Sequence, residues 1–349
     1  MLGKHKLSNI KNNYFNVKEK ISMKKIRIAI CGYGNLGKGV EKEIQKNPDM
    51  ELVGIFSRRP AEELNTKSRL LSMENIEQYI EDIDVVIMCG GSANDLEFQV
   101  PQFAEYFNTV DSYDMHAKIP EYYAKVNQAA LRHRHISIIS IGWDPGLFSL
   151  IRHYGESFLP EGKNYTFWGK GISQGHSNAI RRIKGVKDAV QYTIPVKESV
   201  DKVRRGEKPE LTTRDKHIRE CYVVLYDDAD AEKVQNEIVT MPNYFAEYET
   251  IVHFITEEEL KEKHCKMQHG GAVICGAETG ENNKQLMEFS LTLESNPEFT
   301  ASVMIAYARA AYRMKYGPDR YVAGAKTIYD VPPILLSPKM REELIKSIL

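Results

Sequence analysis

The apolar residues in the first part of the chain form short strand-like runs that alternate with helical patterns. Residues 25–31 alternate and then become wholly apolar, as strands of buried parallel sheets do. Leu36, Val40 and Ile44 follow at four-residue spacing, which predicts a helix that ends near Pro48. Further strands are expected at 51–56, 84–89, 108–111 and 136–141, and a further helix at 120–132. This alternation predicts an α/β domain with a parallel, doubly wound sheet.

From about residue 145 onward the pattern changes. Residues 164–168, 219–225 and 249–255 have the pattern of strands in an antiparallel or mixed sheet, which indicates an α+β second domain. A long helix is expected late in the chain, with an apolar face made of Phe299, Val303, Ala306, Tyr307, Ala310 and Met314. We therefore predict a doubly wound domain at 23–144, an α+β domain at 145–296 and a C-terminal helical segment at 297–349 that can return to the first domain. Residues 1–22 are polar and basic, and we expect a flexible extension there, with a short amphipathic helix as the alternative.

Composition narrows the class of protein. The chain has 349 residues, which favours two domains, and its 42% hydrophobic and 27% charged residues are typical of a globular protein. A formal net charge of -1 gives no reason to expect a nucleic-acid partner or an anionic membrane surface. No apolar run reaches the roughly 20 residues that a membrane span needs. The five cysteines are an odd number without a Cys-x-x-Cys pair, so we expect unbridged thiols and a cytoplasmic protein.

The strongest single motif is Gly-x-Gly-x-x-Gly at 32–37. It follows the first predicted strand and opens the first predicted helix, which is the context that a dinucleotide-binding loop of the Rossmann type requires. The first glycine permits the tight turn, the second lets backbone approach the pyrophosphate, and the third allows close packing of helix on strand. The helix N-terminus then offers free N–H groups to the phosphates. The residues expected to bind the cofactor are Gly32, Tyr33, Gly34, Asn35, Leu36 and Gly37 of this loop, and Cys89, Gly90, Gly91 and Ser92 after the strand at 84–89. A purely structural strand-to-helix turn is the alternative.

The residues after the second predicted strand indicate which dinucleotide binds. Enzymes that use NAD usually carry a carboxylate about 20 residues after the glycine motif, where it binds the ribose 2′-hydroxyl. This chain has Ser57, Arg58 and Arg59 there. Two guanidinium groups can pair with a 2′-phosphate in fork geometry, whereas a carboxylate would repel it. The sequence therefore predicts NADP(H), and a solvated arginine loop is the alternative.

Several motifs, in order along the chain, resemble those of the meso-diaminopimelate D-dehydrogenase family. They are Gly-Tyr-Gly-Asn-Leu-Gly at 32–37, Val-Gly-Ile-Phe-Ser-Arg-Arg at 53–59, Val-Asp-Ser-Tyr-Asp at 110–114, Gly-Trp-Asp-Pro-Gly at 142–146, Phe-Trp-Gly at 167–169, Ser-Gln-Gly-His-Ser at 173–177, Val-Gln-Tyr-Thr-Ile-Pro at 190–195, Met-Pro-Asn-Tyr-Phe at 241–245, His-Gly-Gly at 269–271 and Asn-Pro-Glu-Phe-Thr-Ala-Ser at 296–302. The resemblance extends from residue 23 to the C-terminus.

This resemblance implies an oxidoreductase that deaminates the D-centre of meso-2,6-diaminopimelate reversibly, with NADP as cofactor. In the reductive direction the reaction feeds lysine and peptidoglycan precursor synthesis. It also implies a homodimer, in which the domain at 145–296 serves substrate binding and dimerisation. One alternative is an NADP-dependent D-amino acid dehydrogenase of broader substrate range, and another is an NADP-binding sensor without activity.

The resemblance also assigns roles to individual residues. Asp114 and Asp144 each follow a predicted strand, and they are implied to hold the reacting amine. A carboxylate can relay the proton of an ammonium group, but it also stabilises the charged form, so amine binding is the primary assignment. The other implied substrate-binding residues are Trp143, Phe148, Trp168, Gln174, Gly175, Thr193, Arg219, His269 and Asn296.

Among these, Arg219 is implied to clamp the distal carboxylate, because a planar guanidinium binds a carboxylate through two parallel hydrogen bonds. Thr193 and His269 would donate to the same carboxylate, and Asn296 would accept from the distal amine. The backbone at residues 174–175 would face the carboxylate of the D-centre. Each residue has an ordinary alternative, which is a local turn for Asp144 and His269, a surface charge for Arg219 and a helix cap for Asn296. No metal is expected, because His264, Cys265 and His269 lack a second pair of ligands.

Overall fold

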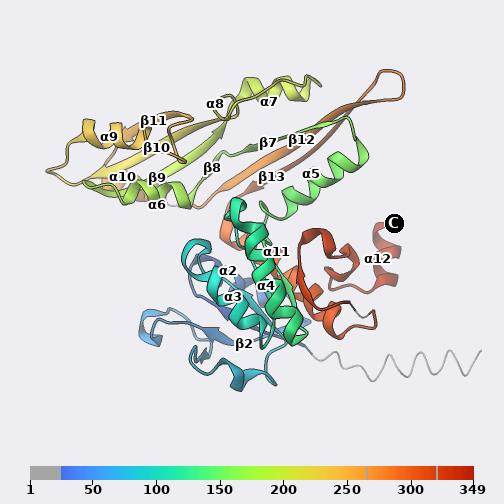
Figure 1. The fold of residues 1–349 in the computed structure, drawn as a ribbon. Coiled ribbons are helices and arrows are strands. Elements are labelled where there is room, and N and C mark those ends of the chain that lie inside the picture. The colour runs from blue at the N-terminus through green and yellow to red at the C-terminus, as the bar shows by residue number, and fades with distance from the viewer. Residues whose placement is uncertain (1–24, 265, 320) are drawn as a thin grey trace, which may run out of the picture. The chain divides into compact units, whose positions relative to one another are not determined.

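The computed structural model describes residues 25–264, 266–319 and 321–349 (Figure 1). The extension predicted at 1–22 lies outside the described residues. The chain divides into two compact units, one that runs up to Gly142 and resumes at Ala301–Leu349, and one that comprises Trp143–Thr300. The sequence placed these divisions at 144 and 296. The two units are described separately below.

The first unit is built on a seven-stranded sheet in which every neighbouring pair of strands is parallel. Its strands are β1 (Ile26–Cys31), β2 (Met50–Phe56), β3 (Leu70–Leu71), β4 (Val85–Met88), β5 (Asn108–Asp111), β6 (Ile136–Ile138) and β14 (Gly324–Lys326). Their order is β14-β6-β5-β4-β1-β2-β3. From β3 to β6 this is the doubly wound order of dinucleotide-binding folds, so the predicted fold class is confirmed.

Helices and short turns connect the strands of this sheet. The helices of the unit are α2 (Asn35–Ile44), α3 (Glu97–Ala104), α4 (Ile119–His133), α12 (Arg341–Ile348) and most of α11 (Asn296–Tyr316). Only the 3-10 turns η1 (Ala61–Glu63) and η2 (Ile76–Tyr79) connect β2 to β3 and β3 to β4. The strands β1 and β4 are almost wholly buried, which explains their continuous apolar sequence.

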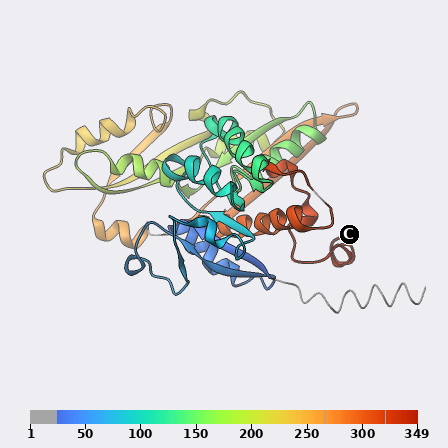
Figure 2. The same ribbon diagram turned by 60° about the horizontal axis from the view of Figure 1, so that its bottom comes forward.

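Helix α11 attaches the C-terminal segment to this sheet, and in Figure 2 its red ribbon runs beside the blue strands. The Arg309 side chain of α11, which is 2% exposed, joins the helix to the residues before β2. Its Nε and Nη2 atoms donate to the Asp49 carboxylate over 2.6 and 2.9 Å. Nη2 also donates to Asn47 Oδ1, and Nη1 donates to the Leu336 carbonyl. The C-terminal segment therefore belongs to the core of the first unit.

The second unit contains two smaller sheets. The four-stranded sheet has the order β11-β10-β9-β8 and mixes parallel and antiparallel pairs, whereas the three-stranded sheet β13-β12-β7 is antiparallel. The strands are β7 (Lys163–Trp168), β8 (Gly171–Ile172), β9 (Val186–Pro195), β10 (His217–Leu225), β11 (Glu249–Phe254), β12 (His269–Thr279) and β13 (Asn283–Leu293). The helices are α5 (Leu147–Phe158), α6 (Gln174–Arg181), α7 (Lys197–Arg204), α8 (Thr213–Lys216), α9 (Ala231–Val239) and α10 (Glu257–Lys263). This arrangement confirms the predicted α+β class.

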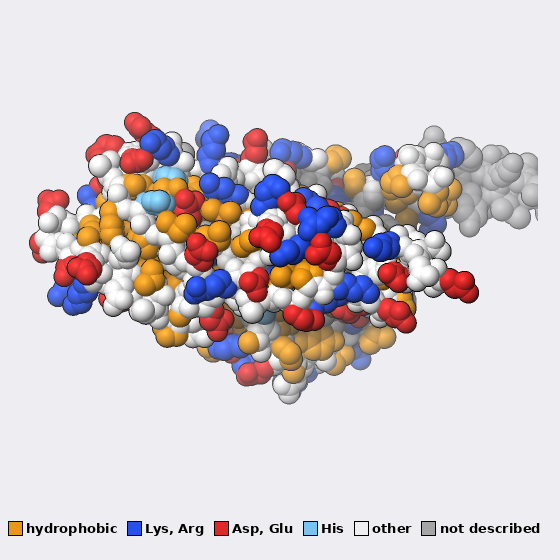
Figure 3. Space-filling model, turned by 90° about the horizontal axis from the view of Figure 1, so that it is seen from above, with side chains coloured by type: hydrophobic (Ala, Val, Ile, Leu, Met, Phe, Trp, Pro, Cys, Tyr) orange, Lys and Arg blue, Asp and Glu red, His pale blue; other side chains and the backbone are white. Residues whose placement is uncertain are grey.

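The surface carries charges of both signs. On the face shown in Figure 3, Lys and Arg side chains are interspersed with Asp and Glu, and apolar side chains lie between them. Among the described residues, no helix combines the length and the apolar character of a membrane span.

We predict that Arg309→Met lowers the free energy of unfolding by about 3–5 kcal/mol, because it leaves the carboxylate of Asp49, whose side chain is 12% exposed, without its cation. Burial by itself would raise the pKa of Asp49, but the hydrogen bonds and charge of Arg309 outweigh it and lower the pKa. A carboxyl group with a lowered pKa in the folded state stabilises the fold above its unfolded pKa, and this stabilisation is lost as the pH falls. Denaturant unfolding between neutral and acidic pH should therefore show a weaker pH dependence in Arg309→Met.

The control variant is Lys46→Met, which removes a surface ion pair with Glu43 and should change stability little. Equal unfolding midpoints for Arg309→Met and wild type would contradict the role given to this ion pair.

Candidate functional site

The glycine loop of the first unit has the geometry that close approach of a ligand requires. Gly32 has a φ of +94°, which favours glycine. A Cβ at Gly37 would lie 2.2 Å from the Gly32 carbonyl oxygen, so helix α2 can pack against the loop only because that position is glycine. A Cβ at Gly34 would meet nothing within 4 Å. Gly34 therefore faces open space, where a pyrophosphate can reach the backbone.

Helix α2 begins directly after this open space. Gly34 is its N-cap, and no side chain caps it. The first N–H groups of a helix lack partners within the helix, and the helix dipole makes this end positive. The loop and helix therefore offer donors and partial positive charge to a phosphate, which fits the predicted dinucleotide.

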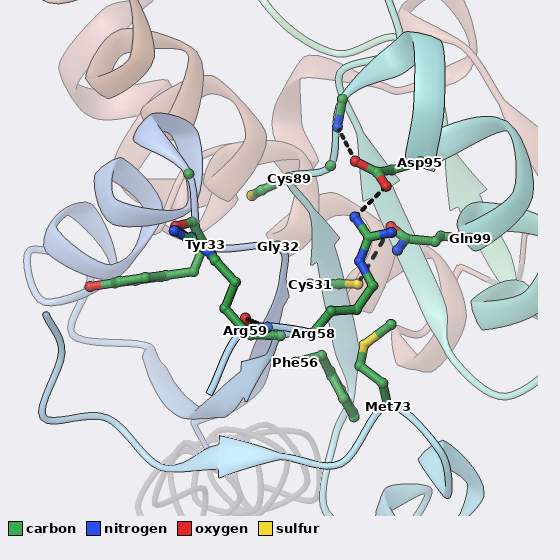
Figure 4. Close-up of a pocket in the computed structure, with 14 residues that line it drawn as sticks. Cys31, Gly32, Tyr33, Phe56, Arg58, Arg59, Met73, Cys89, Asp95 and Gln99 are labelled. Carbon is green, nitrogen blue, oxygen red and sulfur yellow. Dashed lines mark hydrogen bonds and ion pairs between the residues drawn. The ribbon is translucent and has the colours of Figure 1, made fainter. Parts of the chain in front are cut away.

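A cavity of about 280 Å³ lies at this loop (Figure 4). The predicted cofactor residues that line it are Gly32, Tyr33, Gly34, Ser57, Arg58, Arg59, Cys89, Gly90 and Gly91. The predicted residues outside the lining are Asn35, Leu36, Gly37 and Ser92. The sequence analysis missed five lining residues, Cys31, Phe56, Met73, Asp95 and Gln99. Cys31 and Phe56 end β1 and β2 next to predicted residues, so their positions in the sequence could have identified them.

The two arginines after β2 extend to opposite sides of this cavity (Figure 4). Arg59 donates to the Tyr33 carbonyl of the glycine loop. Arg58 donates to Asp95 Oδ1 over 2.6 Å, and Asp95 Oδ2 accepts from the Gly91 N–H over 3.1 Å. The Arg58 side chain is 70% exposed, so this ion pair is weak and leaves the guanidinium available to a ligand.

A buried carboxylate holds the loops at the carboxyl end of β5 and β6. Asp111 Oδ1 accepts from the N–H groups of Tyr113 and Ser140 over 2.9 and 3.0 Å, and Oδ2 accepts from the Tyr122 hydroxyl over 2.8 Å. Burial raises the pKa of Asp111 to about 6, although these hydrogen bonds act in the opposite direction. Asp114 follows on the same loop with an exposed side chain, and its N–H donates to Ser92 Oγ over 3.1 Å.

The second predicted carboxylate, Asp144, lies in the second unit with its side chain 2% exposed. Its Oδ1 accepts from Arg152 Nη2 over 2.7 Å. Its Oδ2 accepts from Arg152 Nη1 over 3.3 Å and from Trp168 Nε1 over 2.6 Å. The carboxylate therefore contacts side chains of α5 and β7 rather than its own turn. A carboxylate offers roughly four lone pairs, so about one remains for a ligand.

Trp143 precedes Asp144 in the chain. Its indole N–H donates to Asn296 Oδ1 over 2.9 Å, and Thr300 donates to the same oxygen over 3.2 Å. The Trp143 ring packs edge-on against Phe148, with 5.2 Å between ring centres, and lies 4.8 Å from the His269 ring. Phe148 is 0% exposed, so the Trp143 ring packs against a fully buried side chain.

Arg219 occupies an unusual environment on β10. Its side chain is 5% exposed, lies 3.9 Å above the Tyr248 ring and donates to Thr193 Oγ1. Its Nε–H has no partner, and no Asp or Glu in the described part of the chain forms an ion pair with it. Burial lowers the pKa of Arg219, against an opposing effect of Tyr248. A buried cation without a counter-charge is costly, so an anionic ligand at this position would be stabilised.

The same face of the sheet carries further polar groups that sequence reasoning missed. The Gln191 side chain is 0% exposed, its Nε2 lies 3.5 Å from Thr193 Oγ1, and its Oε1 has no partner. Burial lowers the pKa of His176 and of His217 to about 3, with a further contribution from Arg219. These histidines are therefore neutral at physiological pH, and Arg219 is the charged member of the cluster.

The remaining predicted residues lie at the start of α6. Gln174 and Gly175 are exposed, and a Cβ at Gly175 would meet nothing within 4 Å. Ser173 precedes the helix without capping it through its side chain. This backbone is therefore open to a ligand. No cluster of three metal-ligating side chains occurs among the described residues, which exclude Cys265.

Comparisons with known proteins agree with one another. A family model described as the diaminopimelic acid dehydrogenase C-terminal domain matches residues 142–295. The chain is 60% identical over 329 residues to the meso-diaminopimelate D-dehydrogenase of Ureibacillus thermosphaericus. This alignment covers 94% of this chain and 100% of the relative. It is 48% identical over 323 residues to the protein of the same name from Corynebacterium glutamicum, which covers 93% of this chain and 99% of the relative.

Two solved structures extend the comparison. The Corynebacterium glutamicum DAP dehydrogenase in complex with DAP matches with a TM-score of 0.88 and 47% identity, over 94% of this chain and 100% of that one. An engineered D-amino acid dehydrogenase bound to NADP+ matches with a TM-score of 0.83 and 46% identity, over 93% and 100%.

We predict that Gly34→Ala leaves the fold intact but weakens dinucleotide binding at least about tenfold, because the new methyl group points into the space that the pyrophosphate needs. Thermal unfolding and cofactor titration measure the two effects separately. Gly37→Ala is the contrasting variant, since its methyl group would collide with the Gly32 carbonyl and should lower the melting temperature as well. Unchanged cofactor affinity in Gly34→Ala would remove the loop from the binding site.

Proposed function

The chain belongs to the meso-diaminopimelate D-dehydrogenase family, and we propose that it deaminates the D-centre of meso-2,6-diaminopimelate reversibly, with NADP as cofactor. In the oxidative direction, meso-2,6-diaminopimelate, NADP+ and water give L-2-amino-6-oxopimelate, ammonium, NADPH and a proton. The reductive direction contributes to lysine and peptidoglycan precursor synthesis. The names of the relatives and the ligands of the two solved structures support this proposal.

The cofactor site favours the phosphorylated dinucleotide. Ser57, Arg58 and Arg59 follow β2, at the position where a carboxylate would bind the ribose hydroxyls of NAD. Both guanidinium groups line the cavity, and a 2′-phosphate can accept hydrogen bonds from them. Asp95 also lines the cavity, but Arg58 is paired with it. When bound, NADP+ supplies the acceptor for the hydride of the substrate carbon.

The assignment of the substrate depends mainly on the environment of Arg219. It is a buried cation with an unpaired N–H and with no acidic partner among the described residues. A carboxylate of the substrate would supply the missing counter-charge. Thr193 accepts from Arg219, so its own hydroxyl proton is free to donate to the same carboxylate. A simple D-amino acid has no second head group to meet these residues, whereas diaminopimelate has one.

Within the second unit, the D-centre is assigned to Asp144 and Trp168. Asp144 keeps about one lone pair for the substrate ammonium, since Arg152 and Trp168 occupy the others. Its carboxylate is therefore suited to orient the amine rather than to accept its proton. Asp114 is exposed and is the better candidate to exchange a proton with solvent before hydride transfer. The open backbone at residues 174–175 can bind the carboxylate of this centre.

We also propose a cytoplasmic homodimer. The second unit exposes apolar side chains on the edge strand β11, where Ile251 is 40% and Phe254 is 38% exposed. A second copy of the chain could cover these residues. The cysteines that the structure describes, Cys31, Cys89, Cys221 and Cys275, are unpaired, which is in keeping with a reducing compartment.

We predict that the wild-type protein reduces NADP+ with meso-2,6-diaminopimelate, measured as absorbance at about 340 nm, and that Arg219→Met lowers kcat/KM for this substrate at least about a hundredfold. The physical reason is the loss of the charge-assisted hydrogen bonds to the distal carboxylate. The control is Arg181→Met, which removes an exposed ion pair with Asp188 in the same unit. Wild-type activity on D-alanine that equals activity on meso-2,6-diaminopimelate would instead support a broader D-amino acid dehydrogenase.

We predict that Arg58→Ala and Arg59→Ala each raise the KM for NADP+ about tenfold or more while the KM for NAD+ changes little. The reason is that the 2′-phosphate is the only group that distinguishes the two cofactors. Activity of the variants with NAD+ therefore serves as the internal control for folding. An unchanged ratio of the two KM values would mean that neither arginine reads the 2′-phosphate.

A further inference from the structure

The position of Trp168 is fixed by contacts on two sides, both within the second unit. Its indole N–H donates to Asp144 Oδ2 over 2.6 Å. Its backbone N–H donates to Nε2 of His217 over 2.8 Å. The His217 ring also stacks on the indole, with 5.1 Å between the ring centres and 22° between the planes. One imidazole therefore contacts both the backbone and the aromatic face of the same residue.

His217 is suited to this contact because it is buried and neutral. Its side chain is 1% exposed, and burial lowers its pKa to about 3, with smaller contributions from nearby Arg219, Lys216 and His269. A neutral imidazole has one donor nitrogen and one acceptor nitrogen. Because Nε2 faces an N–H donor, we infer that the ring proton lies on Nδ1. A protonated ring would lose this hydrogen bond.

We propose that His217 is a positioning residue of the substrate site, which holds the backbone and the ring plane of Trp168 and, through the indole N–H, the carboxylate of Asp144. The role of Trp168 and Asp144 at the D-centre rests on the proposed function. The contacts between His217, Trp168 and Asp144 are independent of that function. His217 touches neither substrate nor cofactor in this scheme, and it acts through Trp168.

This arrangement has a physical consequence for substrate binding. An aromatic side chain at the wall of a site loses rotational freedom when a ligand orders it, and this loss weakens binding. His217 and Asp144 order Trp168 when the protein folds. The Asp144 oxygen that accepts from the indole is ordered with it, because Arg152 holds the other side of the carboxylate. The site is therefore organised before the substrate arrives.

Two variants separate the two contacts that His217 makes. His217→Phe keeps an aromatic ring that can stack on the indole, but it removes the acceptor for the Trp168 N–H. His217→Gln keeps an acceptor oxygen at about the reach of Nε2, but it removes the ring. The matched control is His264→Phe, because His264 also stacks on an aromatic ring, that of Tyr222 at 4.0 Å, and its Nδ1 lies 2.9 Å from the Tyr192 hydroxyl.

The first measurement is the indole N–H spectrum of the nitrogen-labelled full-length protein by nuclear magnetic resonance. The chain has two tryptophans, Trp143 and Trp168, so two indole signals are expected, and Trp143→Phe assigns them. His217→Phe should move the Trp168 signal and leave the Trp143 signal in place. His264→Phe should move neither. Because His217→Phe keeps a ring that can stack on the indole, a selective shift of the Trp168 signal reports the loss of the hydrogen bond to the Trp168 backbone N–H.

The second measurement is steady-state kinetics with meso-2,6-diaminopimelate and NADP+. His217→Phe should lower kcat/KM for the amino acid about tenfold, as expected for the loss of one hydrogen bond that organises the site. The KM for NADP+ should be unchanged. His217→Gln should stay within about threefold of wild type, because it keeps the acceptor.

The proposal is overturned if the Trp168 signal of folded His217→Phe matches that of wild type, or if His264→Phe loses as much kcat/KM as His217→Phe. Should His217→Phe fail to fold, the kinetics of His217→Gln decide, because a loss of kcat/KM of about tenfold in a variant that keeps the acceptor would contradict the role given to the hydrogen bond to the Trp168 N–H. A wild-type protein that does not oxidise meso-2,6-diaminopimelate would refute the proposed function, and the spectra would still test the positioning role.

Discussion

A charge removed from water needs an opposite charge or a full set of hydrogen bonds, and this constraint organises both units. In the first unit the buried Arg309 is matched by Asp49, and that pair attaches the C-terminal helix to the sheet. In the second unit the buried Asp144 is matched by Arg152. Arg219 is buried without such a match among the described residues. The paired charges therefore hold elements of the fold together, whereas Arg219 lacks, within the described part of the chain, the counter-charge that an anionic ligand would supply.

The two candidate sites are built by different physical means. The candidate cofactor site of the first unit depends on backbone, because Gly32 supplies the turn, Gly37 allows the helix to approach, and Gly34 leaves open space. Such a site is sensitive to the addition of a single methyl group. The candidate substrate site of the second unit depends on side chains that hold one another, such as Thr193 with Arg219 and Trp168 with Asp144.

The sequence predicted those parts of the structure that depend on local pattern. The buried strands, the glycine loop at 32–37 and the arginines that follow β2 were recognisable because strand periodicity and motif spacing are short-range signals. Strand β14 was missed, because it has three residues and joins the sheet from the far end of the chain. The roles of Arg152 and His217 were also missed. His217 contacts Trp168, which is 49 residues away, and Arg152 pairs with Asp144 across the turn between them, so no strand or helix periodicity encodes either contact.

Asp144 shows how such contacts decide between alternatives that the sequence leaves open. From Asp-Pro-Gly alone, a local turn and a substrate contact were equally reasonable. In the structure, both carboxylate oxygens accept from Arg152, and one of them also accepts from Trp168. The side chain is therefore neither a turn cap nor a fully available ligand. A carboxylate with about one free lone pair accepts an ammonium group from a single direction. Direction matters more than affinity for an enzyme that must present one hydrogen of a stereocentre to a nicotinamide, because a misplaced carbon lowers the rate even when the substrate stays bound.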